Sequence, residues 1–499
     1  MLLLSDLQKS ISTHLEKNAF FINGCFHSYY DFAIAMSKIR KAIQSNISET
    51  EKHIGLVTND DLETYAAIIA LWFEGKACVP ISPEAPKNRN KNIIRQALIR
   101  TIIDSSEKPQ FPEYNLIGSR KLPESELDLA PKNTSNQELA YILFTSGTTG
   151  QPKGVPITRE NLDCFNTAFW EIGFNIDDDD RCLQMFELTF DFSVVSYLVP
   201  LLKGACQYTI PKNVIKYGYI YQLMDEQKLT FAGLVPSVLY YLCPHFDEIN
   251  LPDMKYCIFC GEALPLDITE EWARCLPKAE IFNFYGPTEQ TVFCTYYPFD
   301  RTSRNKTHNG VLSIGKAMKG TKTIVVDESN HRSPPGGKGE LCLAGIQLTP
   351  GYWNDERKNK EAFFLSNTSG RDERFYKTGD LCFIDEDGDI MYLGRIDSQT
   401  KIQGFRVELG EIEFHVKSFL DKTNVAAMVL TDKTGNTEIG LVIESREFDT
   451  TPLDNYLKIR MPAYMIPKKV RFVDFLPLNT NGKTNKKQLQ QLFGNSAHE

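Results

Sequence analysis

The sequence predicts an α/β protein with more than one domain, and three observations support this prediction. A chain of 499 residues is too long for a single hydrophobic core. Helical patterns alternate with short apolar runs in its first half, as in α/β layers. From about residue 311 short strands and turns predominate. We expect a large N-terminal domain of α/β layers with a β-rich subdomain, residues 1–396, and a small mobile α+β domain, residues 397–499.

The α/β alternation begins near the N-terminus. Residues 31–43 and 61–75 have helical patterns, whereas the apolar runs "HIGLV" at 53–57 and "ACVPI" at 77–81 are strand-like. The polar, proline-bearing segment 106–138 predicts a loop over the surface.

The alternation resumes around a glycine-rich loop. The apolar run "AYILF" leads directly into "TSGTTGQPKG", residues 145–154. After a connection we expect a helix with Thr158 as its N-cap and with Glu160 and Asn161 in its first turn. Further on, "TKTIVVD", "GELCLAG" and "GDIMYLG" are strand-like, and "GRIDSQ" at 394–399 indicates the domain boundary. The last hundred residues contain "ELGEIEFHVKSFL" and the strand-like runs "NVAAMVL" and "IGLVIES".

Charge and hydropathy exclude several classes of function. Lys+Arg 55 against Asp+Glu 64 gives a net charge of −9, which argues against a broad nucleic-acid or anionic-membrane surface. The N-terminal "MLLLSDLQKS" is too short for a signal sequence, and we find no apolar run long enough to cross a bilayer. We expect a cytoplasmic protein without nucleic-acid or membrane partners.

The twelve cysteines do not form the pattern of a disulfide framework. Cys257 and Cys260 in "KYCIFCGE" are spaced as CxxC, but a zinc ribbon needs a second such pair and a turn between the ligands. We interpret the stretch as a buried strand with two reduced thiols on opposite faces.

The glycine-rich loop has the composition of a phosphate-binding loop. Glycines let backbone N–H groups approach an anion, hydroxyls add donors, and lysine adds positive charge. Its spacing fits neither of two common patterns, because residue 152 is proline where the Walker motif needs glycine, and Gly147 and Gly150 are spaced too widely for GxGxxG. Taken alone, the loop is equally consistent with a solvated turn.

Four further motifs follow the loop in order: "NFYGPTE" at 283–289, "YKTGDL" at 376–381, "GRIDSQTKIQGFRVELGEIE" at 394–413 and "LPLNTNGKTNKKQL" at 476–489. With the loop, they resemble the ANL adenylate-forming superfamily, which contains acyl-CoA synthetases, luciferases and the adenylation domains of nonribosomal peptide synthetases. The resemblance covers almost the whole chain. It implies that a carboxylate attacks the α-phosphate of ATP and releases pyrophosphate, and that Mg²⁺ helps to neutralise the charge.

The resemblance implies roles for individual residues. Glu289 is the Mg²⁺-associated carboxylate and Thr288 a donor to the α-phosphate. Tyr285 stacks on adenine and Asn283 contacts the edge of the base, whereas Asp380 accepts the ribose hydroxyls. The implied ATP-binding set is Thr145, Ser146, Gly147, Thr148, Thr149, Gly150, Lys153, Gly261, Glu262, Asn283, Phe284, Tyr285, Gly286, Asp380, Arg395 and Lys483.

Two implied roles concern the small domain. The single lysine of the family in this motif, Lys483, reaches the α-phosphate and the substrate carboxylate during adenylation, which requires domain closure. Asp397 matches the hinge about which the domain rotates before thioester formation, bringing the face around Gly404 to the site. A turn-forming aspartate is the other interpretation of Asp397, and both can hold.

Asp191 in "FELTFDFSVVSYL" matches the aspartate that binds the substrate ammonium in amino-acid-activating members. A buried carboxylate is costly without such a cation, although a capping or hydrogen-bonded aspartate is the alternative. The implied amino-acid pocket is Asp191, Phe192, Val195, Gly233, Ile258, Cys260, Phe284, Val292 and Phe293.

The composition of this pocket predicts a small, uncharged amino acid. "FCGEALP" with Cys260 is similar to D-alanine–carrier protein ligases, whereas "ELGEIE" is closer to peptide-synthetase adenylation domains, so the stereochemistry stays open. No carrier-type "GGxS" serine is visible, and we expect the phosphopantetheine thiol on a separate carrier protein. Exposed lysines are candidates for carrier contact, or are simply solvated: Lys468, Lys469, Lys486 and Lys487.

Three other functions are compatible with parts of this pattern. An acyl- or aryl-CoA ligase would use the same motifs with free coenzyme A as the acceptor. A luciferase-like oxygenase has no specific support in the sequence. A non-catalytic binding protein would be expected to lack Lys483 or Glu289, and both residues are present.

Overall fold

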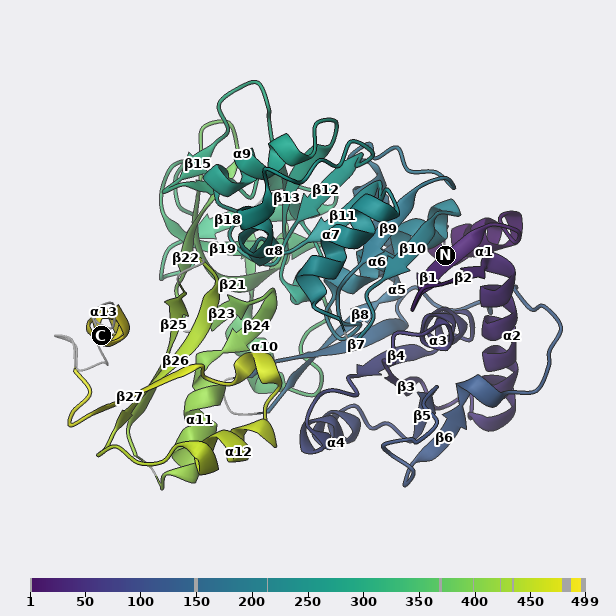
Figure 1. Ribbon diagram of the computed structural model, residues 1–499, viewed down its shortest axis with the longest axis horizontal. Helices are drawn as coiled ribbons and strands as arrows, with labels where there is room; N and C mark the ends of the chain where they lie inside the picture. Colours follow the sequence, from purple (N-terminus) through teal and green to yellow (C-terminus); the bar gives the residue numbers. More distant parts are fainter. Residues whose placement is uncertain are drawn as a thin grey trace. The chain divides into compact units, whose positions relative to one another are not determined.

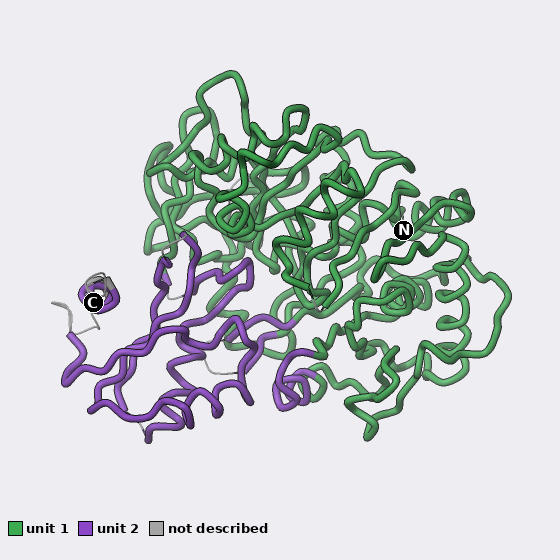
Figure 2. Tube along the Cα trace, viewed as in Figure 1, with its two compact units in different colours: residues 1–83, 94–143, 154–396 green, residues 84–93, 144–153, 397–499 purple. Residues whose placement is uncertain are grey.

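The computed structural model describes residues 2–147, 151–212, 214–367, 370–397, 399–421, 423–432, 435–477 and 486–494. The chain divides into two compact units (Figure 2). The first comprises residues 1–83, 94–143 and 154–396. The second comprises residues 397–499 together with two short segments, 84–93 and 144–153, so the glycine-rich loop belongs to it.

A nine-stranded sheet forms much of the first unit, in the order β17-β14-β13-β12-β11-β9-β10-β1-β2 (Figure 1). Its strands are β1 (Asn18–Ile22), β2 (Cys25–Ser28), β9 (Arg181–Gln184), β10 (Cys206–Thr209), β11 (Phe231–Leu234), β12 (Tyr256–Phe259), β13 (Glu280–Tyr285), β14 (Thr295–Pro298) and β17 (Lys316–Ala317). The central strands pair in parallel and are buried, which explains their short, almost continuous apolar runs. Ligands of open parallel sheets bind at the carboxyl ends of such strands.

A six-stranded sheet follows the order β6-β5-β3-β4-β7-β8. Its strands are β3 (His53–Val57), β4 (Ala77–Ile81), β5 (Thr101–Asp104), β6 (Asn115–Gly118), β7 (Leu139–Thr145) and β8 (Lys153–Thr158). The predicted strands at 53–57 and 77–81 are confirmed. The predicted loop 106–138 is wrong in part, because residues 115–118 form an edge strand parallel to β5 and a short 3₁₀ turn follows at Ser119–Lys121.

Helices of the first unit pack against these sheets (Figure 1). They are α1 (Leu2–Thr13), α2 (Tyr29–Asn46), α3 (Leu62–Phe73), α5 (Arg159–Trp170), α6 (Phe192–Lys203), α7 (Lys216–Glu226), α8 (Ser237–Leu242), α9 (Leu266–Cys275) and α10 (Glu356–Ala362), while α4 (Lys87–Gln96) crosses the boundary between the units. The predicted start of α5 is confirmed, since the Thr158 hydroxyl accepts from Asn161 N and the Asn161 side chain accepts from Thr158 N in a capping box.

The β-rich part of the first unit is a five-stranded antiparallel sheet. It comprises β18 (Thr321–Val326), β19 (Gly339–Gly345), β20 (Phe363–Asn367), β21 (Asp372–Ile384) and β22 (Ile390–Arg395). The sequence predicted β18, β19 and β22 but not the long strand β21. Lysine, threonine and glycine interrupt the apolar run of β21, so its alternation is weak.

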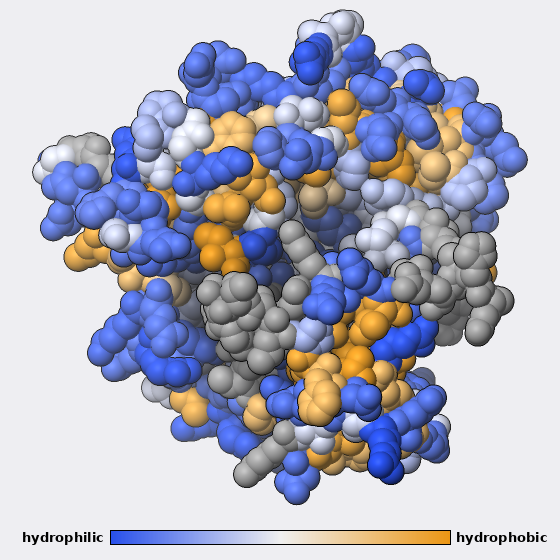
Figure 3. All heavy atoms as spheres, turned by 90° about the vertical axis from the view of Figure 1, so that its left-hand side faces the viewer, coloured by the Kyte–Doolittle hydropathy of each residue, from blue (hydrophilic) through white to orange (hydrophobic). Residues whose placement is uncertain are grey.

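The second unit has its own small core. A hairpin of β23 (Gln399–Ile402) and β24 (Phe405–Glu408) leads into helix α11 (Leu409–Phe419). A three-stranded sheet consists of β25 (Val425–Thr431), β26 (Thr437–Glu444) and β27 (Lys469–Val473). The unit also contains the helices α12 (Thr451–Lys458) and α13 (Lys486–Gly494). None of the helices in the described part of the chain has the length and hydrophobicity that a membrane span requires. On the face drawn in Figure 3, hydrophilic side chains predominate and hydrophobic ones form separate groups.

Candidate active site

The glycine-rich loop connects strand β7 to strand β8. Residues 144–153 belong to the second unit, whereas most of both strands belongs to the first. Ser146 and Lys153 are buried, and Thr145 is the last residue of β7. The Ser146 hydroxyl donates to the Arg406 carbonyl at 2.7 Å, and Gly147 N donates to Glu411 Oε2 at 3.2 Å. The described part of the loop thus directs an N–H group towards a carboxylate, as an anion-binding loop does.

Lys153 adds a positive charge beside a second carboxylate. Its Nζ lies 3.5 Å from Glu408 Oε1, at the start of α11. Thr148, Thr149 and Gly150 lie outside the described residues, so their predicted phosphate contacts stay predictions.

The tight bend after β13 positions Glu289. A Cβ atom on Gly286 would lie 2.4 Å from the Val292 carbonyl oxygen, so only glycine fits this close approach. Thr291 and Val292 follow with φ values of 55° and 67°, a strained conformation for β-branched residues. The Gln347 amide donates to the Phe293 carbonyl at 2.8 Å and helps to hold this backbone.

Glu289 is fully buried in the short 3₁₀ turn Thr288–Gln290, whereas Thr288 is partly exposed. The Tyr352 hydroxyl donates to Glu289 Oε1 at 2.6 Å, and a carboxylate fixed in this way suits Mg²⁺, which uses few protein ligands beside substrate phosphates. Glu289 therefore fits the implied metal role.

A second carboxylate, Asp380, lies opposite Arg395 in the register of β21 and β22. Arg395 Nη1 donates to Asp380 Oδ1 at 2.8 Å, and the Tyr285 hydroxyl donates to Asp380 Oδ2 at 2.5 Å. Burial, and next the negative charge of Asp380, raise the pKa of Tyr285 well above its usual value, so the phenol keeps its proton. We call these two hydrogen-bonded groups, Tyr285 with Asp380 and Arg395, and Glu289 with Tyr352, together the polar cluster.

The remaining predicted ATP-binding residues of the first unit lie at the ends of parallel strands. Asn283 is buried on β13, and its amide donates to the Ser313 carbonyl at 2.9 Å. Gly261 follows β12 with φ of 98°, and Glu262 Oε2 accepts from Ser237 N at 2.9 Å.

Asp191 lies at the N-cap position of α6 and is 6% exposed. Its φ and ψ of −65° and −24° are helical, and its side chain makes no capping hydrogen bond to the first turn, so of the two alternatives the hydrogen-bonded aspartate stays open. The Tyr141 phenol lies nearby, and its pKa is raised by burial and then by the negative charge of Asp191. Val195, one turn later, faces the same side of the helix.

Aromatic rings pack beside Asp191. The Phe192 ring stacks on Phe186 with centroids 4.1 Å apart and contacts Phe293 edge-on at 5.0 Å. Phe293 in turn lies 4.8 Å from Phe284. We call Phe186, Phe192, Phe284 and Phe293 the aromatic wall.

The aromatic wall lies against the carboxyl ends of β11 and β12. A Cβ atom on Gly233 would lie 2.9 Å from the Phe192 ring, and Gly233 pairs with Ile258 across the two strands. Cys260 and Val292 are buried in the same hydrophobic cluster. The contacts bring five residues of the predicted pocket together, Phe192, Gly233, Ile258, Phe284 and Phe293, whereas Cys260 and Val292 belong to the extended core of the same unit.

The predicted residues of the second unit are less fully described. Lys483 lies outside the described residues, so its catalytic role stays a prediction. Asp397 is the first residue of the unit after the boundary, and its Oδ1 accepts from Gln399 N at 3.0 Å, which is the turn contact of the alternative interpretation. Lys468 is exposed, and Lys469 Nζ lies 2.5 Å from Glu438 Oε1. The side chains of Lys486 and Lys487 lie outside the described part.

Sequence reasoning missed three of the residues that complete these clusters. Tyr352 contacts Glu289, Phe186 stacks on Phe192, and Tyr141 lies near Asp191. None of the three lies in a motif with a known local spacing to its partner. The only signal was the aromatic character of Tyr352 in "TPGYW". All twelve cysteines, including Cys257 and Cys260, are free thiols.

Known proteins resemble this chain in sequence and in structure. The family described as AMP-binding enzyme matches residues 7–353. Tyrocidine synthase 3 of Brevibacillus parabrevis is 29% identical over 488 residues, which are 96% of this chain and 7% of that protein. Tyrocidine synthase 1 of the same organism is 29% identical over 473 residues, which are 93% of this chain and 42% of that protein. The chain thus spans less than half of the length of either relative.

Two solved structures share the fold. The Vibrio cholerae adenylation domain AlmE, in complex with glycyl-adenosine-5'-phosphate, has a TM-score of 0.87 and 24% identity over 99% of this chain and 97% of that chain. Holo-PA1221, an NRPS protein containing adenylation and PCP domains, has a TM-score of 0.85 and 23% identity over 98% and 84%.

Proposed function

The chain belongs to the AMP-binding enzyme family and has the fold of ANL adenylation domains, and from this premise we propose that it activates a small amino acid with ATP. The products would be an aminoacyl adenylate and pyrophosphate. The aminoacyl group would then pass to the phosphopantetheine thiol of a separate carrier protein.

The polar cluster supports the nucleotide part of this proposal. Asp380 is held by Tyr285 and Arg395, which leaves its carboxylate oriented to accept hydroxyl groups such as those of ribose. Glu289 would hold Mg²⁺ beside the phosphates, and the metal would supply a positive charge that neutralises their oxygens. The glycine-rich loop would donate to the β- and γ-phosphates.

The position of Asp191 is the observation that carries the choice of an amino acid. Its carboxylate is buried beside the aromatic wall and does not cap the helix on which it lies. An ionised carboxylate in such surroundings is stabilised by a cation at hydrogen-bond distance. The α-ammonium group of an amino acid would supply this charge.

The aromatic wall supports a small side chain. The Phe192 ring lies against Gly233 and fills the space that a larger pocket would need. The rings of Phe186 and Phe293 pack on the Phe192 ring. We expect a pocket bordered by these rings to favour a substrate without branches. AlmE, whose structure holds a glycyl adenylate, is consistent with a substrate of the size of glycine or alanine.

Transfer to a carrier protein is supported by the relatives alone. PA1221 contains both adenylation and PCP domains. Coenzyme A is the alternative acceptor, because its thiol and the thiol of a carrier protein both stand at the end of a phosphopantetheine arm. Thioester assays with each acceptor separate the two.

ATP–pyrophosphate exchange tests the proposal across a panel of D- and L-amino acids and simple carboxylic acids. We expect exchange with glycine or alanine and little with branched or charged amino acids. The Asp191→Asn variant should raise the amino-acid KM about a hundredfold and leave the ATP KM unchanged, since it removes only the partner of the ammonium.

Asp225→Asn on the exposed face of α7 is the matched control and should behave as the wild type. Exchange with none of the acids would refute adenylation. Exchange with simple carboxylic acids alone, or an unchanged amino-acid KM in Asp191→Asn, would refute the assignment of the ammonium partner.

A further inference from the structure

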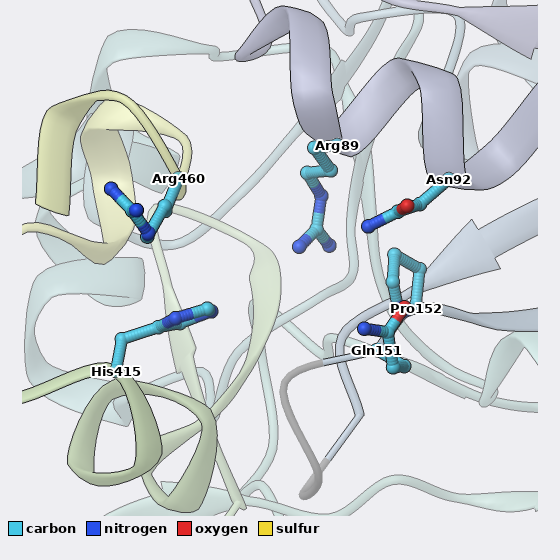
Figure 4. A pocket seen from close by; sticks show the side chains of 6 residues that line it. All are labelled: Arg89, Asn92, Gln151, Pro152, His415 and Arg460. Atoms are coloured by element: carbon cyan, nitrogen blue, oxygen red, sulfur yellow. The ribbon is translucent and has the colours of Figure 1, made fainter. Parts of the chain in front are cut away.

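A cavity of about 160 Å³ in the second unit adjoins the glycine-rich loop. It is lined by Arg89, Asn92, Gln151, Pro152, His415 and Arg460 (Figure 4). Because Gln151 and Pro152 belong to the loop that is proposed to hold the phosphates of ATP, this cavity is part of the same proposed site. A separate group of polar side chains lies in the first unit, next to the aromatic wall.

Asp60 lies in the loop between β3 and α3, and its neighbours fix its position. The Asn59 amide donates to Asp104 Oδ1 at 2.9 Å, and Asp61 caps α3. Asp60 itself has a φ of 60°, a conformation that is uncommon outside glycine and persists where the surrounding structure holds it. Its carboxylate is thus held at the carboxyl end of β3, where it accepts a hydrogen bond from the Tyr65 hydroxyl.

Tyr65 connects Asp60 to Gln184. The tyrosine is buried on α3, and its ring stacks on Phe20 with centroids 5.0 Å apart. Burial, and next the negative charge of Asp60, raise the pKa of Tyr65 well above its usual value, so the hydroxyl keeps the proton that it donates to Asp60. The oxygen of the same hydroxyl accepts from Gln184 Nε2 at 3.3 Å. Hydrogen bonds chained in this way strengthen one another.

The Gln184 amide extends the chain of hydrogen bonds to the backbone of Phe186. It is buried at the end of β9, where its Nε2 donates to the Phe186 carbonyl at 3.0 Å and its Oε1 accepts from Phe186 N at 3.2 Å. Phe186 belongs to the aromatic wall and stacks on Phe192. Hydrogen bonds therefore run without a break from a titratable carboxylate to the wall.

Gln207 gives the Tyr65 hydroxyl a second acceptor. It is fully buried on β10, and neither atom of its amide has a hydrogen-bond partner among the described residues. The amide nevertheless lies close enough to the Tyr65 hydroxyl to lower the pKa of the phenol. When Asp60 binds a proton and becomes a weaker acceptor, the hydroxyl can turn to the amide oxygen of Gln207.

The groups that face Asp60 set the pH at which this change occurs. Burial raises the pKa of Asp60 to about 6, although the hydrogen bond from Tyr65 lowers it. Lys212 and Lys216 also lower this pKa, and Asp61 raises it. Above about pH 6 the carboxylate holds the Tyr65 hydroxyl by a charge-assisted hydrogen bond. Below that pH both groups are neutral, and such a bond is about half as strong.

We propose that Asp60, Tyr65 and Gln184 are positioning residues for the choice of the amino acid. Their hydrogen bonds hold Phe186 in the aromatic wall, and proton binding at Asp60 weakens this hold. The inference rests on the proposed function, which places the amino acid beside the wall. Discrimination in favour of a small amino acid should therefore be highest when Asp60 is ionised. None of the three positioning residues needs to contact the substrate.

The first experiment follows the Phe186 amide by NMR in the full chain with isotope-labelled phenylalanine, across a pH range centred on about pH 6. Phe186→Leu identifies the signal among the 31 phenylalanines. We expect the signal to titrate with a midpoint near pH 6, because the Phe186 N–H donates to Gln184 Oε1. Asp60→Asn should abolish the titration, since an amide does not bind a proton in this range.

Tyr65→Phe separates the chain of hydrogen bonds from a long-range effect of charge. The variant leaves Asp60 ionisable and keeps the ring, but it removes the hydroxyl between Asp60 and Gln184, so the Phe186 signal should no longer titrate. Asp225→Asn on the exposed face of α7 is the matched control and should titrate as the wild type. Far-UV circular dichroism establishes that each variant is folded. A Phe186 signal that does not titrate, or that titrates equally in Tyr65→Phe and the wild type, would overturn the proposal.

Pyrophosphate exchange across the same pH range tests the effect on selection. The ratio of kcat/KM for glycine to that for a larger amino acid cancels any effect of pH on ATP binding. We expect this ratio to fall about threefold or more as Asp60 is protonated, and to stay at its low value in Asp60→Asn. A constant wild-type ratio beside a titrating Phe186 signal would overturn the role in selection. Exchange with none of the acids would refute the proposed function instead, and the Phe186 titration would then decide on the chain of hydrogen bonds alone.

Discussion

The polar cluster and the aromatic wall lie in the same unit, but different forces position their side chains. In the polar cluster, hydrogen bonds fix the carboxylates: Tyr285 and Arg395 donate to Asp380, and Tyr352 donates to Glu289. In the aromatic wall, ring packing fixes the side chains, with centroids 4.1 to 5.0 Å apart along the chain of contacts.

This difference predicts two kinds of response to mutation. Loss of one hydrogen-bond partner in a buried polar cluster leaves another group unsatisfied, so the effect is large and depends little on the substrate. Loss of volume in a packed wall opens space instead, so the effect is graded and depends on the size of the substrate. The polar cluster should therefore control affinity for the nucleotide, and the wall should control selection of the acid.

The largest effect is expected for Asp380→Ala in the polar cluster. The change leaves Arg395 without its carboxylate partner. It should lower kcat/KM for ATP roughly a hundredfold in pyrophosphate exchange, which corresponds to about 3 kcal/mol of activation free energy. Tyr285→Phe removes one hydroxyl and keeps the ring, so about a tenfold loss is expected. Nearly wild-type kcat/KM in Asp380→Ala would break the comparison.

Asp60 tests the cost of carboxylate burial on which the role of Asp191 depends. Burial raises the pKa of Asp60 to about 6, although a hydrogen bond from Tyr65 opposes the shift. Between pH 3.8 and about pH 6 the folded state thus holds more protons than the unfolded state, so stability falls as pH rises through this window. At about 1.4 kcal/mol per pKa unit, the loss is at most about 3 kcal/mol.

Asp60→Asn should remove this pH dependence, because an amide does not titrate, while its oxygen can still accept from Tyr65. Urea unfolding below and above the window measures the difference for both proteins. Asp61→Asn is an unsuitable control because Asp61 caps α3, whereas the exposed Asp225→Asn is suitable. Parallel pH profiles of the variant and the wild type would contradict the prediction.

Phe192→Ala should change substrate selection without a comparable effect on ATP. Removing the ring opens space beside Gly233. The ratio of kcat/KM for glycine to that for larger amino acids should therefore fall about tenfold or more, which corresponds to about 1–3 kcal/mol. Pyrophosphate exchange across the amino-acid panel measures it. Phe32→Ala, a buried ring on α2, is the control for lost volume elsewhere in the unit. A panel that is unchanged in Phe192→Ala would show that the wall does not border the substrate.

The smallest effect is expected for Cys260→Ala. The change removes a single sulfur atom from the pocket, so the preference among small amino acids, or between their enantiomers, should change by less than about 1 kcal/mol. Cys257→Ala, three residues earlier on β12, is the matched control. An identical substrate and enantiomer profile would exclude Cys260 from selection.

The sequence by itself determined the features that depend on neighbours along the chain. The capping box at Thr158 and Asn161 is formed within one helical turn, and Gly286 is required by a bend whose residues all lie within the stretch 286–293. The buried strands were readable for the same reason, since their apolar runs are continuous. The ordered motifs then identified the family, which the match over residues 7–353 confirms.

Tertiary structure decided what surrounds each of these residues. Tyr352 contacts Glu289 from 63 residues away, and Arg89 contacts Glu411 from 322 residues away. Such pairs have no fixed spacing, because strand order and loop length bring them together only after folding. The stacking of Phe186 on Phe192 and the cavity beside Arg460 are of this kind: composition permits them, but only the packing of the sheets and helices creates them.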